Sequence, residues 1–593
     1  MKNVLLLSLA LTANAGAFPS WMGVYGSFVR HTAGGNPGAF TVLMNQDYSG
    51  LHASVGIQVN GSSFIEYSMT YAGYDVDAGI SNSVWTYTPS ATYPAGVVVQ
   101  YYFRGYEDSS SSTIYDSNSG SNYYFKIGSD ENEPVLSSWF TKNSGQYARI
   151  RETTGSAPIA TWTGQTLPAY SDVQMIAYST NYVYVYAAGL ASHVMGPWYL
   201  DANKTMLFPN KPVNQRVTMR FPRTPLAAGI THSSTSLGAN GMYVNGTALF
   251  NMQDAFSYDN ATSSDRSPQQ GGDGIWNRDA GFAEILTFDA NNAHQPQNGQ
   301  YHSHLNPVAL RYQLGDNATF NAASNTYSEY TNSLHHSPIL GWTYDGFPIY
   351  GPYGYSAATD SASGIRRMIS GFVLRNGQYG TSNLSVTGRT TLPVWAQIVQ
   401  NRTSLTSSQY GPATTKTPDM TGSFAVGRYA EDYDHLADLP ASAAQWDLDR
   451  YNGRYCVTPD FPNGTYAYFV TINANGSGAF PYVTGWQLNG VVSGGTVASI
   501  TESVTTQFVG GANSTMEITG LTAGGSDVVL TWSSVEGGTY TVSASSDLST
   551  WSDLNPTIGA TGVVSQASEA GAASNNSKRF YKLRRSSLAS YDP

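Results

Sequence analysis

Apolar and polar residues alternate along several segments of the chain with the period of two that β-strands produce. Residues 97–104 read Val-Val-Val-Gln-Tyr-Tyr-Phe-Arg, so that every odd-numbered position is apolar. Residues 173–178 and 182–187 are similar short segments, and in the second of them tyrosine alternates with valine. Apolar residues at helical spacing are scarce, whereas turn-favouring clusters of Gly, Pro, Asn and Ser recur along the chain. The pattern therefore predicts an all-β protein built from many short strands.

Two polar segments divide this pattern into regions. Residues 128–134 are acidic and polar, and residues 490–496 read Gly-Val-Val-Ser-Gly-Gly-Thr, so both have the composition of linkers. A chain of 593 residues corresponds to about three or four domains. We therefore expect β-sandwich modules flanking a larger β-rich central domain. The predicted order is a β-sandwich at 18–128, the central domain at 135–488, a linker at 489–514 and a second β-sandwich at 515–584.

Residues 1–17 are typical of a secretory signal peptide. Lys2 precedes an apolar run at residues 4–11, and Ala15-Gly16-Ala17 matches the small-residue pattern of a cleavage site. The run is too short to cross a bilayer, and no later stretch reaches 18 apolar residues. The single cysteine, Cys456, allows no internal disulfide bond, which favours a bacterial origin for an exported multidomain protein. We therefore expect a secreted, periplasmic or cell-surface protein without a transmembrane segment.

The composition excludes some partners. Charged residues make up 12% of the chain, the formal net charge is −11, and the 42 tyrosines outnumber the 29 lysines and arginines. No basic run is present, so nucleic acid and anionic membranes are poor partners for this protein. The oligomeric state cannot be predicted from these features.

The feature most indicative of chemistry is the pair His302 and His304, which stand two residues apart. With 10 histidines in 593 residues, about 0.17 such pairs are expected by chance. Side chains at i and i+2 of a strand point to the same face, so both imidazoles can reach one ion. Neutral imidazole is the commonest metal ligand in proteins. The alternative is a pair of surface or hydrogen-bonded histidines without a metal.

The sequence around this pair resembles the YHYH domain family, whose name motif here reads Tyr301-His302-Ser303-His304. The most specific match is the segment 336–354, His-Ser-Pro-Ile-Leu-Gly-Trp-Thr-Tyr-Asp-Gly-Phe-Pro-Ile-Tyr-Gly-Pro-Tyr-Gly. Segments 189–198, 244–251, 448–456 and 463–482 match further parts of the family pattern in order. Ser303 replaces the second tyrosine of the motif, and the segment at Tyr466 lacks histidine. The resemblance covers about half of the chain and implies a fold more than a reaction, since the family is defined by sequence.

Further ligands must come from other segments. His294 precedes a turn at residues 295–299, and a hairpin there would return it beside the histidine pair. His336 opens the most specific family-like segment, which favours it over its neighbour His335, and His193 is a fourth candidate. The carboxylates of Asp289 and Asp345 are candidates as ligands or as acceptors that orient the imidazoles. Such a nitrogen-rich set predicts copper or zinc as the cofactor.

The N-terminal region resembles carbohydrate-binding sandwich modules. The segments that carry the resemblance are Trp85 before Tyr-Thr-Pro, residues 93–96, 98–105, 114–117 and 122–125. Flat aromatic rings stack on the apolar faces of sugars, so we expect polysaccharide contacts from Trp21, Trp85, Tyr102 and Tyr106. Any of these rings could instead fill the core of the sandwich. The region after residue 515 resembles the fibronectin type III-like modules of bacterial exoproteins.

Two functions follow from these observations. The first is an exported protein whose central domain binds a transition metal, as a metal-dependent enzyme or a metal-binding receptor docked to polysaccharide. The second is a non-catalytic, glycan-binding or adhesive surface protein with structural histidines. The chain contains no phosphate-binding Gly-x-x-x-x-Gly-Lys loop, no His-Glu-x-x-His motif and no intact Gly-x-Ser-x-Gly motif. No catalytic residue or reaction is therefore predicted.

Overall fold

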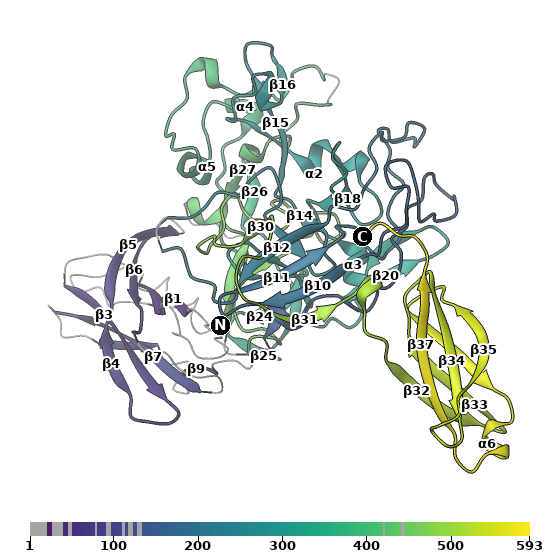
Figure 1. The fold of residues 1–593 in the computed structure, drawn as a ribbon. Coiled ribbons are helices and arrows are strands. Elements are labelled where there is room, and N and C mark those ends of the chain that lie inside the picture. Colours follow the sequence, from purple (N-terminus) through teal and green to yellow (C-terminus); the bar gives the residue numbers. More distant parts are fainter. Residues whose placement is uncertain are drawn as a thin grey trace.

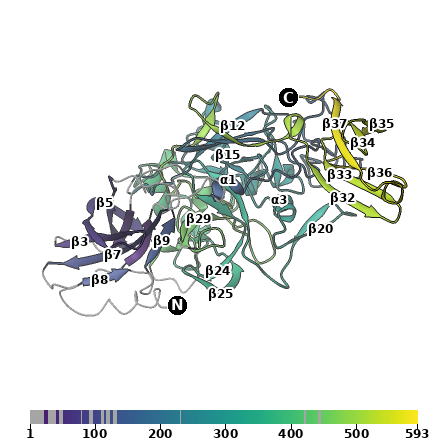
Figure 2. The ribbon, with the colours of Figure 1, turned by 60° about the horizontal axis from the view of Figure 1, so that its bottom comes forward.

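A computed structural model describes residues 21–26, 40–44, 50–77, 80–90, 97–108, 113–116, 122–126, 133–229, 231–418, 422–440, 445–462 and 464–593. The predicted signal peptide, residues 1–17, lies outside the described residues. Within the described part of the chain the structure is β-rich, with short helices, as the alternating pattern predicts. No helix found there is long and apolar enough to cross a membrane. The N-terminal and C-terminal strands lie at opposite ends of the central region in both views (Figure 1, Figure 2).

Two sheets pack face to face in the N-terminal region. Their shared core contains Val42 and Trp85 from one sheet and Val55, Tyr101 and Phe103 from the other. The alternation predicted for residues 97–104 is confirmed, because Tyr101 and Phe103 are buried while Tyr102 is only half-buried. One sheet contains, in order, β1 (Trp21–Gly26), β2 (Phe40–Met44), β6 (Ile80–Tyr87) and β5 (Thr70–Asp77). The other contains β4 (Ile65–Ser68), β3 (Leu51–Val59), β7 (Val98–Glu107) and β8 (Thr113–Asp116), with β9 (Tyr123–Lys126) also paired to β7.

The central region is built on a five-stranded and an eight-stranded sheet. The first contains, in order, β30 (Gly495–Val497), β12 (Val217–Pro222), β11 (Tyr182–Ala187), β10 (Val173–Tyr178) and β31 (Thr505–Val509). The second contains β18 (Ala293–His294), β19 (His302–Ser303), β14 (Ala248–Leu249), β13 (Gly241–Tyr243), β22 (Ile339–Thr343), β23 (Pro348–Tyr350), β29 (Thr465–Phe469) and β28 (Gly453–Cys456). Strands β10 and β11 have the predicted bounds. Both sheets contribute fully buried residues to one core, among them Val185, Phe221, Met242 and Trp342.

The segment predicted as a linker, residues 489–514, contains two strands in this structure. Strand β30 pairs with β12, and β31 pairs with β10, so the two occupy opposite edges of the five-stranded sheet. Edge strands satisfy backbone groups that β10 and β12 would otherwise leave unpaired, which explains why a Gly- and Ser-containing segment is held there. On the N-terminal side, Glu133 of the predicted 128–134 linker is 2% exposed and forms an ion pair with Arg223.

A lobe of short strands and helices projects from the central sheets, at the top of Figure 1. Buried ion pairs such as Arg389–Asp432 and Arg428–Asp265 tie its segments together, at 2.6 Å and 2.5 Å. The lobe contains β15 (Gln253–Asp259), β16 (Ser264–Arg266), β17 (Asn277–Asp279), β26 (Phe372–Leu374), β27 (Tyr433–His435), α4 (Leu384–Thr387) and α5 (Val394–Val399). Further short elements of the central region are α1 (Pro134–Ser137), α2 (Ala280–Ala283), η4 (Ile285–Thr287), α3 (Val308–Gln313) and the hairpins β20 (Ala318–Asn321)–β21 (Thr326–Glu329) and β24 (Tyr353–Ala357)–β25 (Asp360–Arg367).

Two three-stranded sheets form the C-terminal region, in yellow in Figure 1. Trp532 and Tyr540 fill the core between them. One sheet contains β32 (Ile518–Gly524), β33 (Asp527–Ser533) and β36 (Val564–Glu569), and the other contains β35 (Ser552–Gly559), β34 (Gly538–Ser545) and β37 (Phe580–Leu588), with α6 (Ala572–Asn575) beside them. The region contacts the central domain through Glu536, whose carboxylate accepts a hydrogen bond from the Tyr147 backbone N–H and pairs with Arg149.

Candidate metal centre

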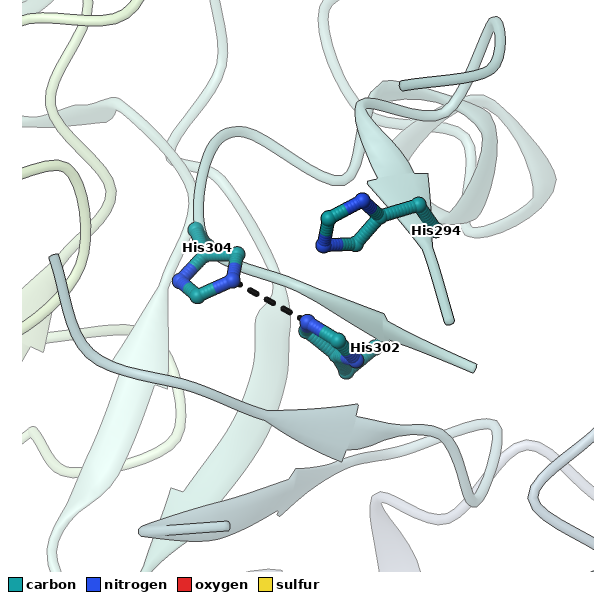
Figure 3. A group of neighbouring side chains, drawn as sticks. All are labelled: His294, His302 and His304. Atoms are coloured by element: carbon teal, nitrogen blue, oxygen red, sulfur yellow. Dashed lines mark hydrogen bonds between the residues drawn. The ribbon is translucent and has the colours of Figure 1, made fainter. Parts of the chain in front are cut away.

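Three histidines meet at the β18 edge of the eight-stranded sheet. Strand β18 pairs antiparallel with β19, and this register places His294 directly opposite His302. The intervening turn at residues 295–299 returns the chain as a hairpin requires. His304 follows two residues after His302 and contributes its imidazole on the same side (Figure 3). The short strand β14 lies on the other side of β19 and pairs with it in parallel.

The imidazole nitrogens of the three side chains converge. The Nε2 atoms of His302 and His304 are 3.0 Å apart, the contact drawn as a dashed line in Figure 3. Donor atoms of His294, His302 and His304 all lie within 4.8 Å of one another. All three side chains are buried, with exposed fractions of 5%, 3% and 3% in that order. Among the described residues, these three form a group that could hold a metal ion.

Hydrogen bonds at the opposite ring nitrogens determine which nitrogen carries the proton. His302 Nδ1 lies 2.9 Å from the Gln300 carbonyl oxygen, and His304 Nδ1 lies 2.5 Å from the Asn251 carbonyl oxygen. A carbonyl oxygen only accepts, so each Nδ1 must donate its hydrogen. His294 Nδ1 lies 2.7 Å from Thr287 Oγ1, whose own hydrogen is donated to the Glu284 carbonyl oxygen. All three Nδ1 atoms are therefore protonated, and all three Nε2 atoms present lone pairs to the centre.

Burial keeps these imidazoles neutral. It lowers the pKa of His294 to about 3 and the pKa of His304 to about 4, with neighbouring His304 adding to the effect on His294. Burial, followed by the charges of His304 and His294, lowers the pKa of His302 well below its ordinary value. Neutral imidazole is the form that binds metal ions. Two lone pairs facing each other at 3.0 Å repel unless a cation lies between them.

Phenylalanine rings enclose the three histidines. Phe250 stacks on His302, with ring centroids 3.8 Å apart and planes at 17°. Phe208 stacks on His294 at 5.9 Å, and Phe288 meets His294 edge to face at 4.9 Å. These contacts hold the imidazole planes in place and remove water from the ring faces. An apolar shell of this kind excludes water from a metal site and holds its ligands in fixed orientations.

Glu284 is a carboxylate that the structure places against this group and that the sequence did not indicate. Its Oε2 atom lies 3.4 Å from His304 Nε2 and 3.7 Å from His294 Nε2. Burial raises the pKa of Glu284 well above its ordinary value, and the charge of Asp254 adds to the rise. The residue follows the four-residue helix α2, and no spacing relative to His302 and His304 distinguishes it in the sequence.

His193 and Asp289 lie behind the three histidines rather than among them. Both bond to the hydroxyl of Tyr301, at 3.1 Å for His193 Nε2 and 2.8 Å for Asp289 Oδ2. Asp289 also accepts hydrogen bonds from the backbone N–H groups of Gly196 and Asn291. Its carboxylate therefore organises the backbone that leads into β18. Burial raises the pKa of Asp289 to about 6 and lowers that of His193 to about 4.

His336 and Asp345 occupy other parts of the central domain. His336 packs against Tyr350 in β23 and against Phe469 in β29. Strand β23 is four positions from β19 in the sheet, which corresponds to about 19 Å. Asp345 is buried in the turn between β22 and β23, where it accepts hydrogen bonds from Thr343 and Tyr468 hydroxyls and backbone N–H groups. The order of strands thus separates both residues from the predicted site.

The four aromatic residues predicted to stack on sugars lie in different environments. Trp85 is 9% exposed in the core of the N-terminal sandwich, and its indole N–H bonds to Ser83, so its ring is not free for stacking. Tyr102 and Tyr106 are half-buried on the outer face of β7. Trp21 belongs to β1, and its side chain is not among the described ones.

A search of curated proteins finds no match to this chain. The model of one protein family, described as YHYH protein, matches residues 218–479. The matched range includes His294, His302, His304 and Glu284, whereas His193 precedes it. The central region of this chain is therefore a YHYH domain.

Proposed function

We propose that the YHYH domain binds one transition-metal ion through the Nε2 atoms of His294, His302 and His304. The observation that carries this proposal is the convergence of three Nε2 lone pairs whose Nδ1 partners are all hydrogen-bond acceptors. Without a cation, the contact of 3.0 Å between His302 and His304 is repulsive. With one, the same arrangement is a coordination site.

The spacing of the His302 and His304 Nε2 atoms fits a first-row transition metal. Two imidazole nitrogens bound at about 2.0–2.1 Å to the same ion are separated by about 2.9 Å at a right angle and about 3.4 Å in a tetrahedron. The observed 3.0 Å lies within this range. Nitrogen donors favour zinc and copper, whereas calcium and magnesium prefer oxygen ligands. We therefore propose zinc or copper as the bound ion.

Elemental analysis of untagged protein tests this proposal. We expect about one equivalent of zinc or copper per chain, removed by a chelator and restored by adding either ion. His302→Ala and His304→Ala should lose the ion, whereas His335→Ala, which removes an exposed histidine elsewhere, should retain it. Less than about a tenth of an equivalent after loading with both ions, or a doubly substituted H302A/H304A protein with full metal content, would overturn the proposal.

Whether the bound ion has an open coordination position distinguishes a metal-dependent enzyme from a metal-binding receptor. A metal-dependent enzyme needs a position for water or substrate, whereas a receptor for the ion itself does not. Titrating the copper-loaded protein with azide distinguishes them. A saturable change in the visible spectrum supports an enzyme, and an unchanged spectrum supports a metal receptor.

We also propose that the N-terminal sandwich binds polysaccharide in an exported protein, through the outer face of β3, β7 and β8. The Tyr102 ring covers Gly56, since a Cβ at Gly56 would be 2.3 Å from a ring atom. Phe64 and Tyr115 adjoin Tyr102 at centroid distances of 5.1 Å and 5.9 Å, and Tyr115 is 58% exposed. Glu66 accepts a hydrogen bond from the Tyr102 hydroxyl and forms an ion pair with Arg104, so charged groups lie beside the rings. Adjacent rings with polar groups between them suit a sugar chain.

Electrophoresis through gels containing soluble polysaccharides tests this second proposal. We expect retardation that Tyr102→Ala and Tyr115→Ala reduce and that Tyr330→Ala, an exposed tyrosine of the central domain, leaves unchanged. Unaltered migration in α-glucans, β-glucans and acidic polysaccharides would contradict it. If the metal proposal fails and this one holds, the alternative of a non-catalytic glycan-binding surface protein is favoured.

A further inference from the structure

We infer that Glu284 is the fourth ligand of the ion and that the ion enters and leaves on the side of this carboxylate. The inference rests on the proposed metal site and extends it from three nitrogen donors to a set of three nitrogens and one oxygen. Three observations carry it: the position of the carboxylate, an unsatisfied oxygen atom, and the greater exposure of the Glu284 side chain compared with His294 and His304.

Backbone contacts hold Glu284 in a defined position relative to His294. Helix α2 begins after Asp279, whose side chain accepts the Gly281 N–H, and it ends where the Glu284 N–H donates to the Ala280 carbonyl oxygen. Thr287 then joins the two candidate ligands, because its Oγ1 atom donates to the Glu284 carbonyl oxygen and accepts from His294 Nδ1. The carboxylate and the imidazole are therefore positioned by one hydrogen-bonded unit.

The Glu284 carboxylate has an oxygen that lacks a donor. Oε2 is buried and has no hydrogen-bond partner within the described part of the structure, although it lies 3.4 Å from His304 Nε2 and 3.7 Å from His294 Nε2. Those two nitrogens carry lone pairs and cannot donate to it. A buried oxygen without a partner is costly. A cation among these three atoms would satisfy the oxygen and both nitrogens together.

Within the described ranges, no neighbouring basic residue that acts on Glu284 is available to compensate the charge of its carboxylate, which leaves that compensation to a bound cation. Asp254 and Asp279 are the acidic groups that act on it electrostatically, and Arg278 is the basic group. Arg278 already bonds Asp254, with Nε 2.5 Å from the Asp254 carboxylate, and its guanidinium lies 3.9 Å from Asp265. The positive charge of Arg278 is thus shared between two other carboxylates.

Glu284 is also the member of the group that reaches solvent. Its side chain is 25% exposed, compared with 6% for the His294 side chain and 4% for the His304 side chain. The aromatic rings of Phe250 and Phe208 cover faces of His302 and His294. Solvent therefore reaches the Glu284 side chain more than the imidazoles of His294 and His304, although Oε2 itself is buried. An ion would approach along this side chain, and rotation of the carboxylate would open the site.

Substitution of Glu284 tests the inference with zinc and cobalt(II) as probes. We expect Glu284→Gln to bind zinc at least about tenfold more weakly in competition with a chromophoric chelator and to release it faster. The visible spectrum of the cobalt-loaded protein should also change, because a charged carboxylate ligand is replaced by neutral water or a neutral amide. Glu284→Asp should be intermediate, since it keeps the charge with a shorter reach. Glu517→Gln makes the same chemical change at an exposed position of the C-terminal region and serves as the control.

The outcomes distinguish a failure of the Glu284 inference from a failure of the metal proposal on which it rests. If Glu284→Gln matches the unaltered protein in zinc affinity, release rate and cobalt spectrum while His302→Ala loses the ion, three histidines bind the metal and the inference is wrong. If the unaltered protein binds neither ion, both proposals fall. Circular dichroism of the metal-free variants establishes that a weaker affinity is not caused by unfolding.

Discussion

The Nε2 atoms of His302 and His304 face each other at 3.0 Å, while the Nδ1 atom of each ring is bound to a backbone carbonyl oxygen. Neither ring can therefore donate a hydrogen to the other in its neutral form. The backbone of two separate segments, at Gln300 and Asn251, maintains this arrangement. A site that could hold a metal ion thus depends on main-chain geometry as much as on the histidines. Three predictions follow from the contacts around it, and a fourth concerns a buried ion pair elsewhere.

Metal removal should destabilise the folded protein. An ion that binds only the folded state stabilises it by about 4 kcal/mol when its concentration is about 1,000 times the dissociation constant. We expect the melting temperature to fall on chelation and to recover on adding zinc. His302→Ala should show no response to zinc, and His335→Ala should respond as the unaltered protein does. Differential scanning calorimetry measures both, and an equal zinc response in H302A would contradict the assignment.

Acid should destabilise the metal-free protein through His304. The pKa of His304 in the folded state is about 4, below its ordinary value of 6.5, because the ring is buried. The unfolded chain therefore binds a proton as the pH falls below 6.5 while the folded chain does not, so the unfolding free energy decreases. Between pH 7 and pH 5 this residue accounts for a loss of about 2 kcal/mol.

Urea denaturation of metal-free protein at the two pH values measures this contribution. In His304→Gln, which cannot take up the proton, the decrease between pH 7 and pH 5 should be smaller by about 2 kcal/mol. An identical decrease in the variant and the unaltered protein would show that His304 is not held neutral in the folded state.

Phe250 should support metal binding through its contact with His302. The two rings stack at 3.8 Å, so Phe250→Leu keeps apolar volume but removes the flat surface that orients the imidazole. We expect zinc affinity to fall roughly tenfold, the scale of losses caused by residues that orient ligands. Phe347→Leu alters a buried phenylalanine of the main core and is the matched control. Equal zinc affinities of these two variants would argue against an orienting role.

Removing only one partner of the buried ion pair between Arg223 and Glu133 should destabilise the fold more than replacing both partners. Their side chains are 1% and 2% exposed, and the guanidinium bonds the carboxylate at 2.6 Å. Arg223→Met leaves a buried carboxylate uncompensated, so we expect a loss of about 3–5 kcal/mol in urea denaturation. Adding Glu133→Gln should recover part of the loss. The partly exposed pair Lys211–Glu152 should contribute less than about 1 kcal/mol by the same measurement.

The sequence by itself determined the local features, namely the strands and the face of each strand on which a side chain lies, because residues adjacent in sequence set them. Alternation over six residues was sufficient to predict β10 and β11 with their observed bounds, because side chains on successive positions of a strand face opposite sides. The same rule predicted that His302 and His304 share a face. The turn-forming residues 295–299 indicated that His294 could return beside them, and the register of β18 and β19 agrees.

Only the tertiary structure decided which distant residues join the pair. Strand β14 lies beside β19 although 53 residues separate His304 from Asn251, and that pairing supplies both the Asn251 carbonyl and the stacked Phe250. The strand order places His336 and Asp345 elsewhere. The end of helix α2 brings Glu284 close to His304. Strand pairing is set by how apolar faces from the whole chain bury one another, whereas periodicity records only which face a residue occupies. For this reason the three histidines could be predicted from the sequence, whereas Glu284 and the contacts of Asn251 and Phe250 could not.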